Sequence, residues 1–413
     1  MNNETSWKVE PSVMAQNTFN PIRAIVDGMK LKPNPEKPMI PLSIGDPTVF
    51  GNLPPPDSAV TGIQEAVVSG KFNGYAPSSG YQTSREAVAR HLTKSGTTTA
   101  PEDVFLASGC SNALELAISV LVNPGENILI PRPGFSLYKT LCLSQGMEVK
   151  SYNCLPERMW EIDLNHLESL IDEKTRAIVV VNPSNPCGSN FPKNHVKNIL
   201  AVASKHKIPL ISDEIYAGMV FRPLEFTSCA ALSDDVPILT CGGISKIFLV
   251  PGWRLGWVVM HDRNNVLGQK IRNALTCLTQ RILGPCTLVQ AILPKILEDS
   301  DNSYMDRAIN IIQTNAEYAF SHIANMPGLQ PVTPQAAFYM MVGISMKNFP
   351  EFKSEVEFTE ALVSEQSVFC LPATCFDYPN YFRIVLTVPE EKLKEAMTRM
   401  EEFCKEHFVP CAA

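Results

Sequence analysis

The stretch PILTCGGISKIFLVPGWRLGWVVM (residues 237–260) contains two apolar, strand-like segments joined by a turn-rich connection. Lys246 and Arg254 are the only charged side chains between Val236 and Met260. Burying a cation costs several kcal/mol unless a partner compensates its charge. The sequence therefore predicts that these two cations, which we expect to be buried, face either carboxylates from elsewhere in the chain or an anionic ligand.

Further apolar segments surround this stretch and predict the fold class. Segments rich in valine, isoleucine and leucine occur at 103–108, 127–132, 177–182, 209–214, 237–242 and 255–260. Near-continuous runs of this kind are typical of parallel strands buried on both faces. Amphipathic helical patterns at 111–122 and 193–206 lie between them. This alternation predicts an α/β domain with a mostly parallel central sheet.

The chain changes character after about residue 300. A long helical pattern (303–325) precedes three apolar segments, AAFYMMVGI, SVFCLPATCF and YFRIVLTV, and a final helix from Pro389 to about His407. We expect a smaller α+β unit there. Prolines clustered in 33–56 predict an extended arm that leads into the first helix. The predicted divisions are 1–56 (arm and part of the small domain), 57–305 (large domain) and 306–413 (small domain).

Composition gives no reason to expect a nucleic acid or a membrane as partner. The net charge is −7, and no apolar run approaches the ~20 residues of a membrane span. Twelve cysteines without a CxxC pair predict reduced thiols rather than a disulfide framework or a metal site. The N-terminal sequence lacks the features of a secretory or transit peptide. We therefore expect a cytoplasmic location.

Polar residues gather where the predicted strands end. Since ligands of open α/β sheets bind beyond the carboxyl ends of the strands, this edge is the predicted site. The residues concerned are Gly109, Cys110, Ser111, Asn185, Asp213, Tyr216, Ser245 and Lys246. Each has a simpler structural explanation, as a helix cap, a turn residue or a surface charge. Those explanations leave the two cations in one apolar segment unaccounted for.

Taken together, these residues fit pyridoxal phosphate. The aldehyde needs a lysine amine, which Lys246 offers. The phosphate needs a cation and free backbone N–H groups, which Arg254 and the helix starting at Gly109 and Cys110 offer. The protonated pyridine nitrogen needs a buried carboxylate, and Asp213 is suited to that.

The remaining atoms of that cofactor also have candidate partners. The phenolic oxygen needs hydrogen-bond donors, and Asn185 and Tyr216 are available. The ring needs a flat neighbour, and Phe135, in PRPGFSLY after a predicted strand, can stack on it.

The run G-I-S-K-x-x-L-V-P-G-W-R-L-G resembles the lysine segment of the class I pyridoxal-phosphate-dependent aminotransferases. With NPSNPCG, SDEIY, SGCSNALE, NGYAPSSGY and YFRI, the resemblance covers the chain from residue 19 to its end. It implies the aspartate-aminotransferase-like fold, fold type I, with a large domain and a smaller α+β domain. The blocks SIGDPTVFGNLP, NPSNPCGSNF, VPGWRLGW, ILGPCTLVQ and FCLPATCF are similar to members of the family that act on aromatic amino acids.

The resemblance implies a role for each site residue. Lys246 would attach the cofactor and move a proton between the substrate Cα and cofactor atom C4′. Arg383 would bind the substrate α-carboxylate, with Asn185 beside it and the backbone of Gly45 closing over it. Tyr75 would reach the phosphate of a neighbouring subunit, which makes the expected active unit a homodimer with shared sites.

Three further expectations follow from the same resemblance. The segment FNPIRAIVD (19–27) would cover the pocket of the partner subunit. Many relatives carry a hydroxyl residue where this chain has Gly243, so the phosphate loses one donor, for which Ser245 is the candidate replacement. Arg281 is a candidate partner for the second carboxylate of a dicarboxylic oxo acid, with an ordinary surface arginine as the alternative.

The expected reaction is transamination of an aromatic amino acid, chiefly tyrosine but also phenylalanine or tryptophan. The acceptor would be 2-oxoglutarate or a similar 2-oxo acid, and 4-hydroxyphenylpyruvate and glutamate the products, as in tyrosine catabolism. The alternatives are another specificity (alanine, methionine, aspartate or broad) or, on the same fold, a β-lyase or cyclopropane-forming synthase. A dinucleotide-dependent oxidoreductase lacks its GxGxxG loop here, and a non-catalytic scaffold has no physical need for the lysine.

Overall fold

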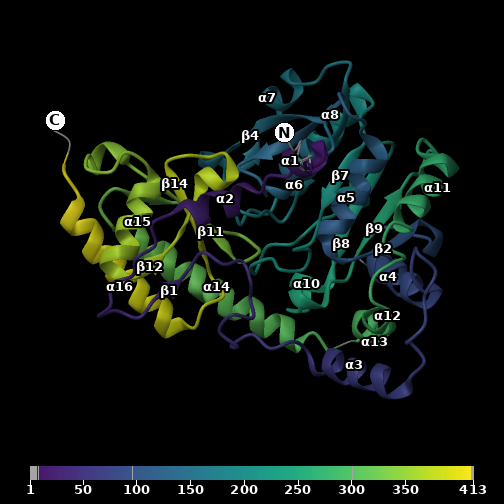
Figure 1. Cartoon of the computed structure of the whole chain (residues 1–413), viewed down its shortest axis with the longest axis horizontal. Coiled ribbons are helices and arrows are strands. Elements are labelled where there is room, and N and C mark those ends of the chain that lie inside the picture. Colours follow the sequence, from purple (N-terminus) through teal and green to yellow (C-terminus); the bar gives the residue numbers. More distant parts are fainter. Residues whose placement is uncertain (1–6, 8, 95, 300, 411–413) are drawn as a thin grey trace, which may run out of the picture.

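The computed structural model describes residues 7, 9–94, 96–299 and 301–410. The chain forms a larger part around an eight-stranded sheet and a smaller part around a four-stranded sheet (Figure 1). This agrees with the predicted α/β unit followed by a smaller α+β unit. The exact divisions at residues 56 and 305 stay predictions.

The large sheet has the order β2-β9-β8-β7-β6-β3-β4-β5. Its strands are β2 (Val104–Ala107), β3 (Asn127–Arg132), β4 (Glu148–Leu155), β5 (Glu161–Ile162), β6 (Thr175–Val181), β7 (Leu210–Asp213), β8 (Ile238–Gly243) and β9 (Gly256–His261). Strands β8, β7, β6, β3 and β4 run parallel, whereas β9 is antiparallel to both neighbours and β5 to β4. The predicted mostly parallel sheet is confirmed; β4 and β5 were not predicted.

Helices cover both faces of this sheet. They are α3 (Asp57–Ser69), α4 (Gln82–Lys94), α5 (Gly109–Leu121), α6 (Leu137–Ser144), α7 (Leu164–Ser169), α8 (Lys193–His206), α9 (Cys229–Leu232), α10 (Ile244–Ile247), α11 (Gly268–Thr279), α12 (Thr287–Ala291) and α13 (Leu293–Glu298). In β6 the side chains of Val179 and Val181 pack in the cluster of α5, and those of Ile178 and Val180 in the cluster of α8. This alternation explains why the strand is apolar throughout.

The smaller part combines two long helices with short strands. Its elements are α14 (Ser303–Ile323), β10 (Leu329–Pro331), β11 (Tyr339–Ile344), α15 (Glu355–Gln366), β12 (Val368–Phe369), β13 (Leu371–Pro372), β14 (Tyr381–Val385) and α16 (Glu390–His407). The antiparallel sheet has the order β10-β11-β14-β13. Strand β1 (Ile40–Pro41), from the proline-rich arm, pairs in parallel with β12. The N-terminal segment is therefore part of this smaller unit.

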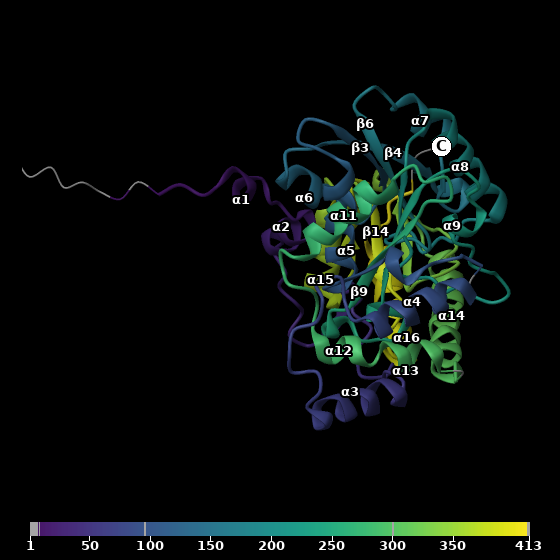
Figure 2. The same ribbon diagram turned by 90° about the vertical axis from the view of Figure 1, so that its right-hand side faces the viewer.

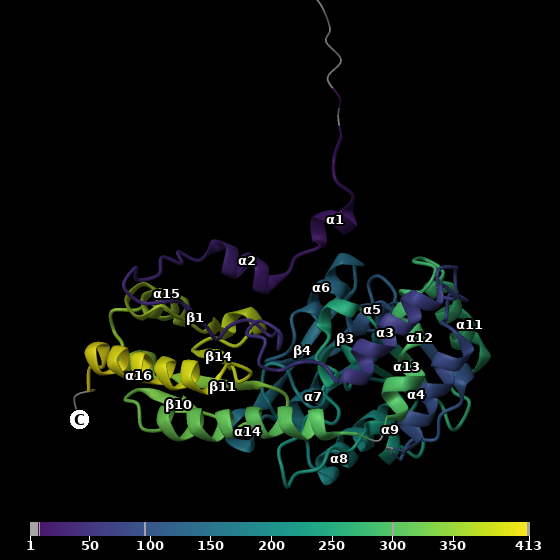
Figure 3. The ribbon, with the colours of Figure 1, turned by 90° about the horizontal axis from the view of Figure 1, so that it is seen from below.

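Two short helices precede the arm, so the prediction that the arm leads into the first helix was wrong. Helix α1 (Val13–Asn17) lies beside α6 on a segment that projects from the body of the chain (Figure 2). Helix α2 (Pro21–Gly28), capped by the Asn20 side chain, lies at the junction of the larger and smaller parts (Figure 3). Residues 1–6 and 8 of the predicted arm lie outside the described residues.

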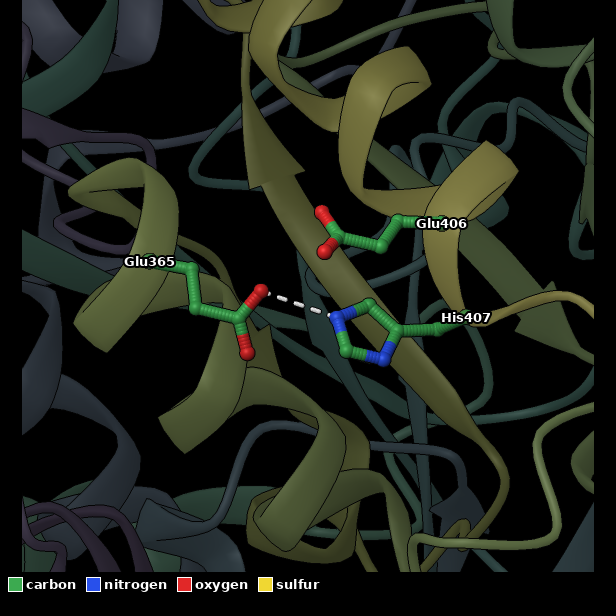
Figure 4. Close-up of side chains that lie close together, drawn as sticks. All are labelled: Glu365, Glu406 and His407. Atoms are coloured by element: carbon green, nitrogen blue, oxygen red, sulfur yellow. Dashed lines mark hydrogen bonds and ion pairs between the residues drawn. The ribbon is translucent and has the colours of Figure 1, made fainter.

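The C-terminal turn of α16 is fastened to α15 through His407. Its Nε2 atom lies 2.8 Å from Oε2 of Glu365 on α15 (Figure 4). Its Nδ1 atom lies 2.6 Å from Oε1 of Glu351, in the loop before α15. Glu406 lies nearby, and one oxygen or nitrogen atom from each of the three side chains in Figure 4 lies within 4.8 Å of the other two. Since both ring nitrogens already bind carboxylates, we assign this group to the packing of α16 rather than to chemistry.

Among the helices of the described residues, none is long and apolar enough to cross a lipid bilayer.

Candidate active site

A pocket of about 570 Å³ opens beyond the carboxyl ends of β6, β7 and β8. It lies where the large sheet, the smaller sheet and the N-terminal segment meet. The predicted site residues that line it are Gly45, Cys110, Ser111, Phe135, Asn185, Asp213, Tyr216, Ser245, Lys246, Arg254 and Arg383. Residues more than 300 positions apart in the sequence are thereby brought together.

Lys246 reaches the pocket from α10, which begins directly after β8. Its half-buried side chain donates a hydrogen bond from Nζ to the carbonyl oxygen of Gly45 at 2.7 Å. The same Nζ atom lies 5.2 Å from the centre of the Phe338 ring and 5.9 Å from that of Tyr216. Among the described residues no carboxylate forms an ion pair with this lysine. Within the described residues, the contacts of this amine are therefore a carbonyl oxygen and two aromatic rings.

Arg254 lies at the rim of the same pocket. Its guanidinium donates to the carbonyl oxygens of Pro251 at 2.9 Å and Ser108 at 3.4 Å, and no carboxylate of the described residues pairs with it. The side chain is exposed, so the expectation that both cations are buried was wrong for this one. The reason is its position at the open end of the pocket, where α5 begins.

Gly109 brings the first turn of α5 directly against this guanidinium. Its φ angle is +78°, and a Cβ atom built there would lie 2.3 Å from an Arg254 nitrogen. A side chain at this position would force the guanidinium to move. The unpaired N–H groups at the start of α5 and the guanidinium thus lie side by side, which is the arrangement that binds a phosphate.

Asp213 ends β7 at the floor of the pocket and is buried. Its Oδ2 atom accepts a hydrogen bond from the hydroxyl of Tyr138 at 2.7 Å. Its Oδ1 atom accepts from the Ile215 N–H at 3.2 Å and from the Cys110 thiol at 3.7 Å. Burial raises the pKa of Asp213, and these donors act in the opposite direction. A cationic ring nitrogen facing this carboxylate would favour its charged form.

Sequence reasoning chose Phe135 from the PRPGFSLY motif and missed Tyr138. The half-buried Phe135 ring lines the pocket and meets the Tyr138 ring edge-on, with centroids 5.9 Å apart. Tyr138 is fully buried below it. Tyr138 follows Phe135 by three residues, a spacing that puts two side chains on the same side of a helical turn. This spacing could have indicated that Tyr138 also lies at the pocket.

Tyr216 forms a hydroxyl pair with Tyr339, the first residue of β11. The two oxygen atoms are 2.7 Å apart, and both side chains are buried. Tyr339 was not predicted. It lies in AAFYMMVGI, which was predicted only as an apolar segment of the smaller unit.

Arg383 enters the pocket from β14, which lies between β11 and β13. It donates to Oδ1 of Asn185 at 2.8 Å and to the carbonyl oxygen of Ser43 at 2.8 Å. It is 4% exposed, so it is not an edge-strand arginine that points into water. Its Nε atom is buried and lacks a hydrogen-bond partner within the described part of the chain. A ligand carboxylate would supply the missing acceptor.

Helix α2 contributes pocket residues that were not predicted individually: Ile22, Arg23 and Val26. We expected its segment to cover the pocket of a partner subunit. In the structure it covers the pocket of its own chain, so that expectation is corrected. Arg23 forms no ion pair with the described carboxylates and is, after Lys246, Arg254 and Arg383, the fourth cation without a carboxylate partner at the pocket.

Two predicted residues lie away from this pocket. Tyr75 is 88% exposed and does not line the pocket of its own chain. Arg281 is exposed and lies 3.5 Å from a carboxylate oxygen of Glu115. Its geometry matches the alternative of a surface arginine.

The absence of a hydroxyl at Gly243 has a steric reason. A Cβ atom there would lie 2.7 Å from the carbonyl oxygen of Leu255 and 2.9 Å from Cα of Gly256. The close approach of β8 and β9 therefore excludes a side chain. Ser245, two residues on, lines the pocket with a buried Oγ atom that has no hydrogen-bond partner among the described residues.

These features fit the predicted cofactor. Arg254, which has no carboxylate partner among the described residues, and the start of α5 suit its phosphate, and a buried carboxylate suits its ring nitrogen. The unpartnered Ser245 Oγ is an available donor. Phe135 offers a flat face and Lys246 an amine. Each property is independent of the others, and the pocket combines them all.

Comparisons with known proteins agree with this geometry. A sequence model of the family described as "Aminotransferase class I and II" matches residues 37–400. Tyrosine aminotransferase of Mus musculus is 56% identical over 402 residues, covering 97% of this chain and 88% of that protein. The crystal structure of tyrosine aminotransferase from Leishmania infantum is 36% identical with a TM-score of 0.94, covering 98% of this chain and all of that one. Alanine aminotransferase from Pyrococcus furiosus is 30% identical with a TM-score of 0.89, covering 96% of this chain and all of that one. The fold is thus the predicted aspartate-aminotransferase-like fold type I.

Proposed function

Since the chain belongs to the aminotransferase class I and II family, we propose that it transfers the amino group of an aromatic L-amino acid, chiefly tyrosine, to 2-oxoglutarate or a similar 2-oxo acid. The chain is a pyridoxal-phosphate-dependent aminotransferase. The aromatic donor, with phenylalanine and tryptophan as further substrates, is supported by the likeness to tyrosine aminotransferases. The products would be 4-hydroxyphenylpyruvate and glutamate, in the catabolism of tyrosine.

One observation carries the proposal: Lys246, Asp213 and Arg383 face the same pocket from three different elements. When bound, pyridoxal phosphate supplies a ring that withdraws electrons from the substrate Cα. Lys246 would hold the cofactor and carry the proton to and from that carbon as a general base and acid.

The other residues would hold the cofactor in place. Asp213, oriented by Tyr138, would keep the ring nitrogen protonated. Arg254 and the start of α5 at Gly109–Ser111 would bind the phosphate, with Ser245 as a further donor. Phe135 would lie on the ring face.

The substrate carboxylate would bind at Arg383. A guanidinium can donate two parallel hydrogen bonds to a carboxylate, and Asn185 and Ser43 already fix the plane of this one. Its unpartnered Nε atom is available to a ligand. Asn185 could then donate from its amide nitrogen to the cofactor or the substrate.

The two substrates place opposite demands on the rest of the pocket. An aromatic side chain needs apolar walls, which Ile22, Val26, Ile44 and Leu371 supply. A dicarboxylic oxo acid needs a second cation. We propose Arg23 for that carboxylate in preference to Arg281, because Arg23 lines the pocket and Arg281 is paired with Glu115.

We also propose a homodimer with shared sites, in the cytoplasm. Tyr75, Ile282 and Leu283 are large side chains exposed at 88%, 47% and 58%. The segments that carry them lie next to each other: the Thr287 hydroxyl donates a hydrogen bond to the carbonyl oxygen of Phe72. A partner subunit covering this surface would bring Tyr75 to another pocket. The buried, unpaired cysteines suit a reducing compartment.

The test is a steady-state panel of tyrosine, phenylalanine, tryptophan, methionine, alanine, aspartate and leucine, each with several 2-oxo acids. We expect kcat/KM to be highest for tyrosine with a dicarboxylic acceptor. A clear preference for alanine, methionine or aspartate would contradict the aromatic specificity and support an aminotransferase of that other specificity. Release of pyruvate and ammonia from a donor with a β-leaving group, without transamination, would indicate a lyase instead.

A further inference from the structure

Tyr339 contacts three parts of the pocket at once. Its hydroxyl oxygen lies 2.7 Å from that of Tyr216. Its ring centre lies 4.3 Å from Cζ of Arg383. A Cβ atom on Gly45 would lie 2.5 Å from the same hydroxyl, so the backbone that accepts the Lys246 hydrogen bond passes directly over it.

The hydroxyl pair has a preferred direction once a ligand is bound. A tyrosine hydroxyl has one proton to donate and can accept from others. If Tyr216 gives its proton to a cofactor oxygen, its lone pairs must accept from Tyr339. In a buried site such a chain strengthens the outer hydrogen bond. Both hydroxyls lie in buried side chains, where an unfilled acceptor is costly.

The ring of Tyr339 supports the arginine independently of its hydroxyl. A guanidinium at 4.3 Å from a ring centre is within cation–π distance. Phe376 flanks the same guanidinium at 5.0 Å. The ring and the hydroxyl of one side chain thus serve different partners, and mutations can separate their effects.

We propose that Tyr339 is a positioning residue that couples the cofactor side of the pocket to the substrate side, its hydroxyl orienting Tyr216 and its ring orienting Arg383. This inference rests on the role proposed above for Arg383 and on the expected hydrogen bond from Tyr216 to the phenolic oxygen of the cofactor. Tyr339 itself takes no proton in the reaction.

The variant Tyr339→Phe removes the hydroxyl and keeps the ring. A donor to the cofactor's phenolic oxygen favours its deprotonated form, so weakening that donor raises the pH midpoint of the cofactor's visible absorption. We expect a rise of about 0.5 to 1 pH unit and a fall in kcat of about three- to tenfold, because one neutral hydrogen bond is lost. The KM for tyrosine should change less than twofold, since Arg383 keeps its ring neighbour.

The variant Tyr339→Leu removes the ring as well. Here the KM for tyrosine should also rise, by about threefold or more, because the guanidinium loses its flat support. Tyr378→Phe is the matched control: Tyr378 is half-buried, lies in the smaller part and does not line the pocket. It should leave the absorption midpoint, kcat and KM unchanged.

A double-mutant cycle tests whether Tyr339 acts through Tyr216. In the Tyr216→Phe background, Tyr339→Phe should cause no additional shift of the absorption midpoint. A full additional shift there would overturn the coupling, as would an unchanged midpoint in Tyr339→Phe alone. If Tyr216→Phe itself leaves the midpoint unchanged, the role proposed for Tyr216 fails first. An unchanged KM in Tyr339→Leu would overturn the support of Arg383.

Discussion

The Nζ atom of Lys246 donates a hydrogen bond to the carbonyl oxygen of Gly45, 201 residues away in the sequence. Two residues earlier, the carbonyl oxygen of Ser43 accepts from Arg383. One short N-terminal segment therefore contacts both the candidate catalytic amine and the candidate substrate cation. These two hydrogen bonds hold the segment across the pocket, between the large sheet and the smaller one.

Replacing Lys246 with alanine should reduce the transamination rate by at least about a thousandfold, because the general base and acid is lost. Phosphate and ring contacts remain, so cofactor should still bind non-covalently. Borohydride treatment followed by mass spectrometry should find an adduct on Lys246 in the wild type and none in the variant. Lys295→Ala, at a surface ion pair with Glu65, is the control. Near-normal turnover in Lys246→Ala would refute the assignment.

Asp213→Asn should lower kcat by at least about a hundredfold, because the neutral amide no longer stabilises a positive charge on the ring nitrogen. The side chain keeps its size and its contact with Tyr138. Single-turnover absorption measurements report the proton-transfer step directly. The 98% exposed Asp234 provides the control Asp234→Asn. A rate equal to that of the wild type would contradict the electrostatic role.

Arg383→Lys keeps the positive charge but loses the planar pair of donors. We expect KM for tyrosine to rise about 10- to 100-fold, with a smaller change in kcat. The control Arg222→Lys changes a surface arginine paired with Asp306. Steady-state kinetics with an unchanged KM would show that the α-carboxylate binds elsewhere.

Glu214 is a buried carboxyl group whose hydrogen bonds come from Ser212, Ser228 and the Cys229 N–H. Burial raises its pKa from 4.5 to about 7. The folded state therefore binds this proton more tightly than the unfolded state. This tighter binding contributes to the free energy of unfolding. The contribution is fully present below pH 4.5 and is lost as the pH rises through 7.

It follows that Glu214→Gln should be more stable than the wild type at pH 8, by up to about 3 kcal/mol, and about equally stable at pH 5. Urea unfolding at the two pH values measures the difference. Glu402→Gln, at an exposed position, should show no such pH dependence. A constant difference between pH 5 and pH 8 would mean that Glu214 does not change charge in the folded protein.

A mixture of subunits tests the proposed sharing of sites. Lys246→Ala and Tyr75→Ala should each be impaired as pure proteins. Hybrid dimers contain one intact site, made from the lysine of one chain and the Tyr75 of the other. Random mixing should restore about a quarter of the wild-type activity. If the mixture stays at the level of the pure variants, each site is complete within one chain.

Sequence analysis predicted well what depends on short segments. The six apolar runs became β2, β3, β6, β7, β8 and β9, because a strand buried on both faces needs an apolar side chain at every position. Lys246 and Asp213 were predictable because polar residues at strand ends must face the sheet edge. Strand β4, with KSYNC in its centre, was not predicted, because it lies near the edge of the sheet and alternates polar and apolar residues.

The residues that were missed depend on contacts between distant segments. Tyr138 and Tyr339 look like ordinary core aromatics in the sequence, and only the folded chain brings their hydroxyls to Asp213 and Tyr216. The exposure of Arg254 likewise follows from where α5 begins. Helix α2 covers its own pocket because the arm between α2 and β1 folds back along the smaller part, a path that local sequence does not encode.

The contact between Gly109 and Arg254 restricts how this gene product can vary. Even a methyl group at position 109 would collide with the guanidinium and require a left-handed backbone that alanine adopts poorly. A side chain at position 109 would therefore displace the guanidinium from the start of α5 and weaken the proposed phosphate site.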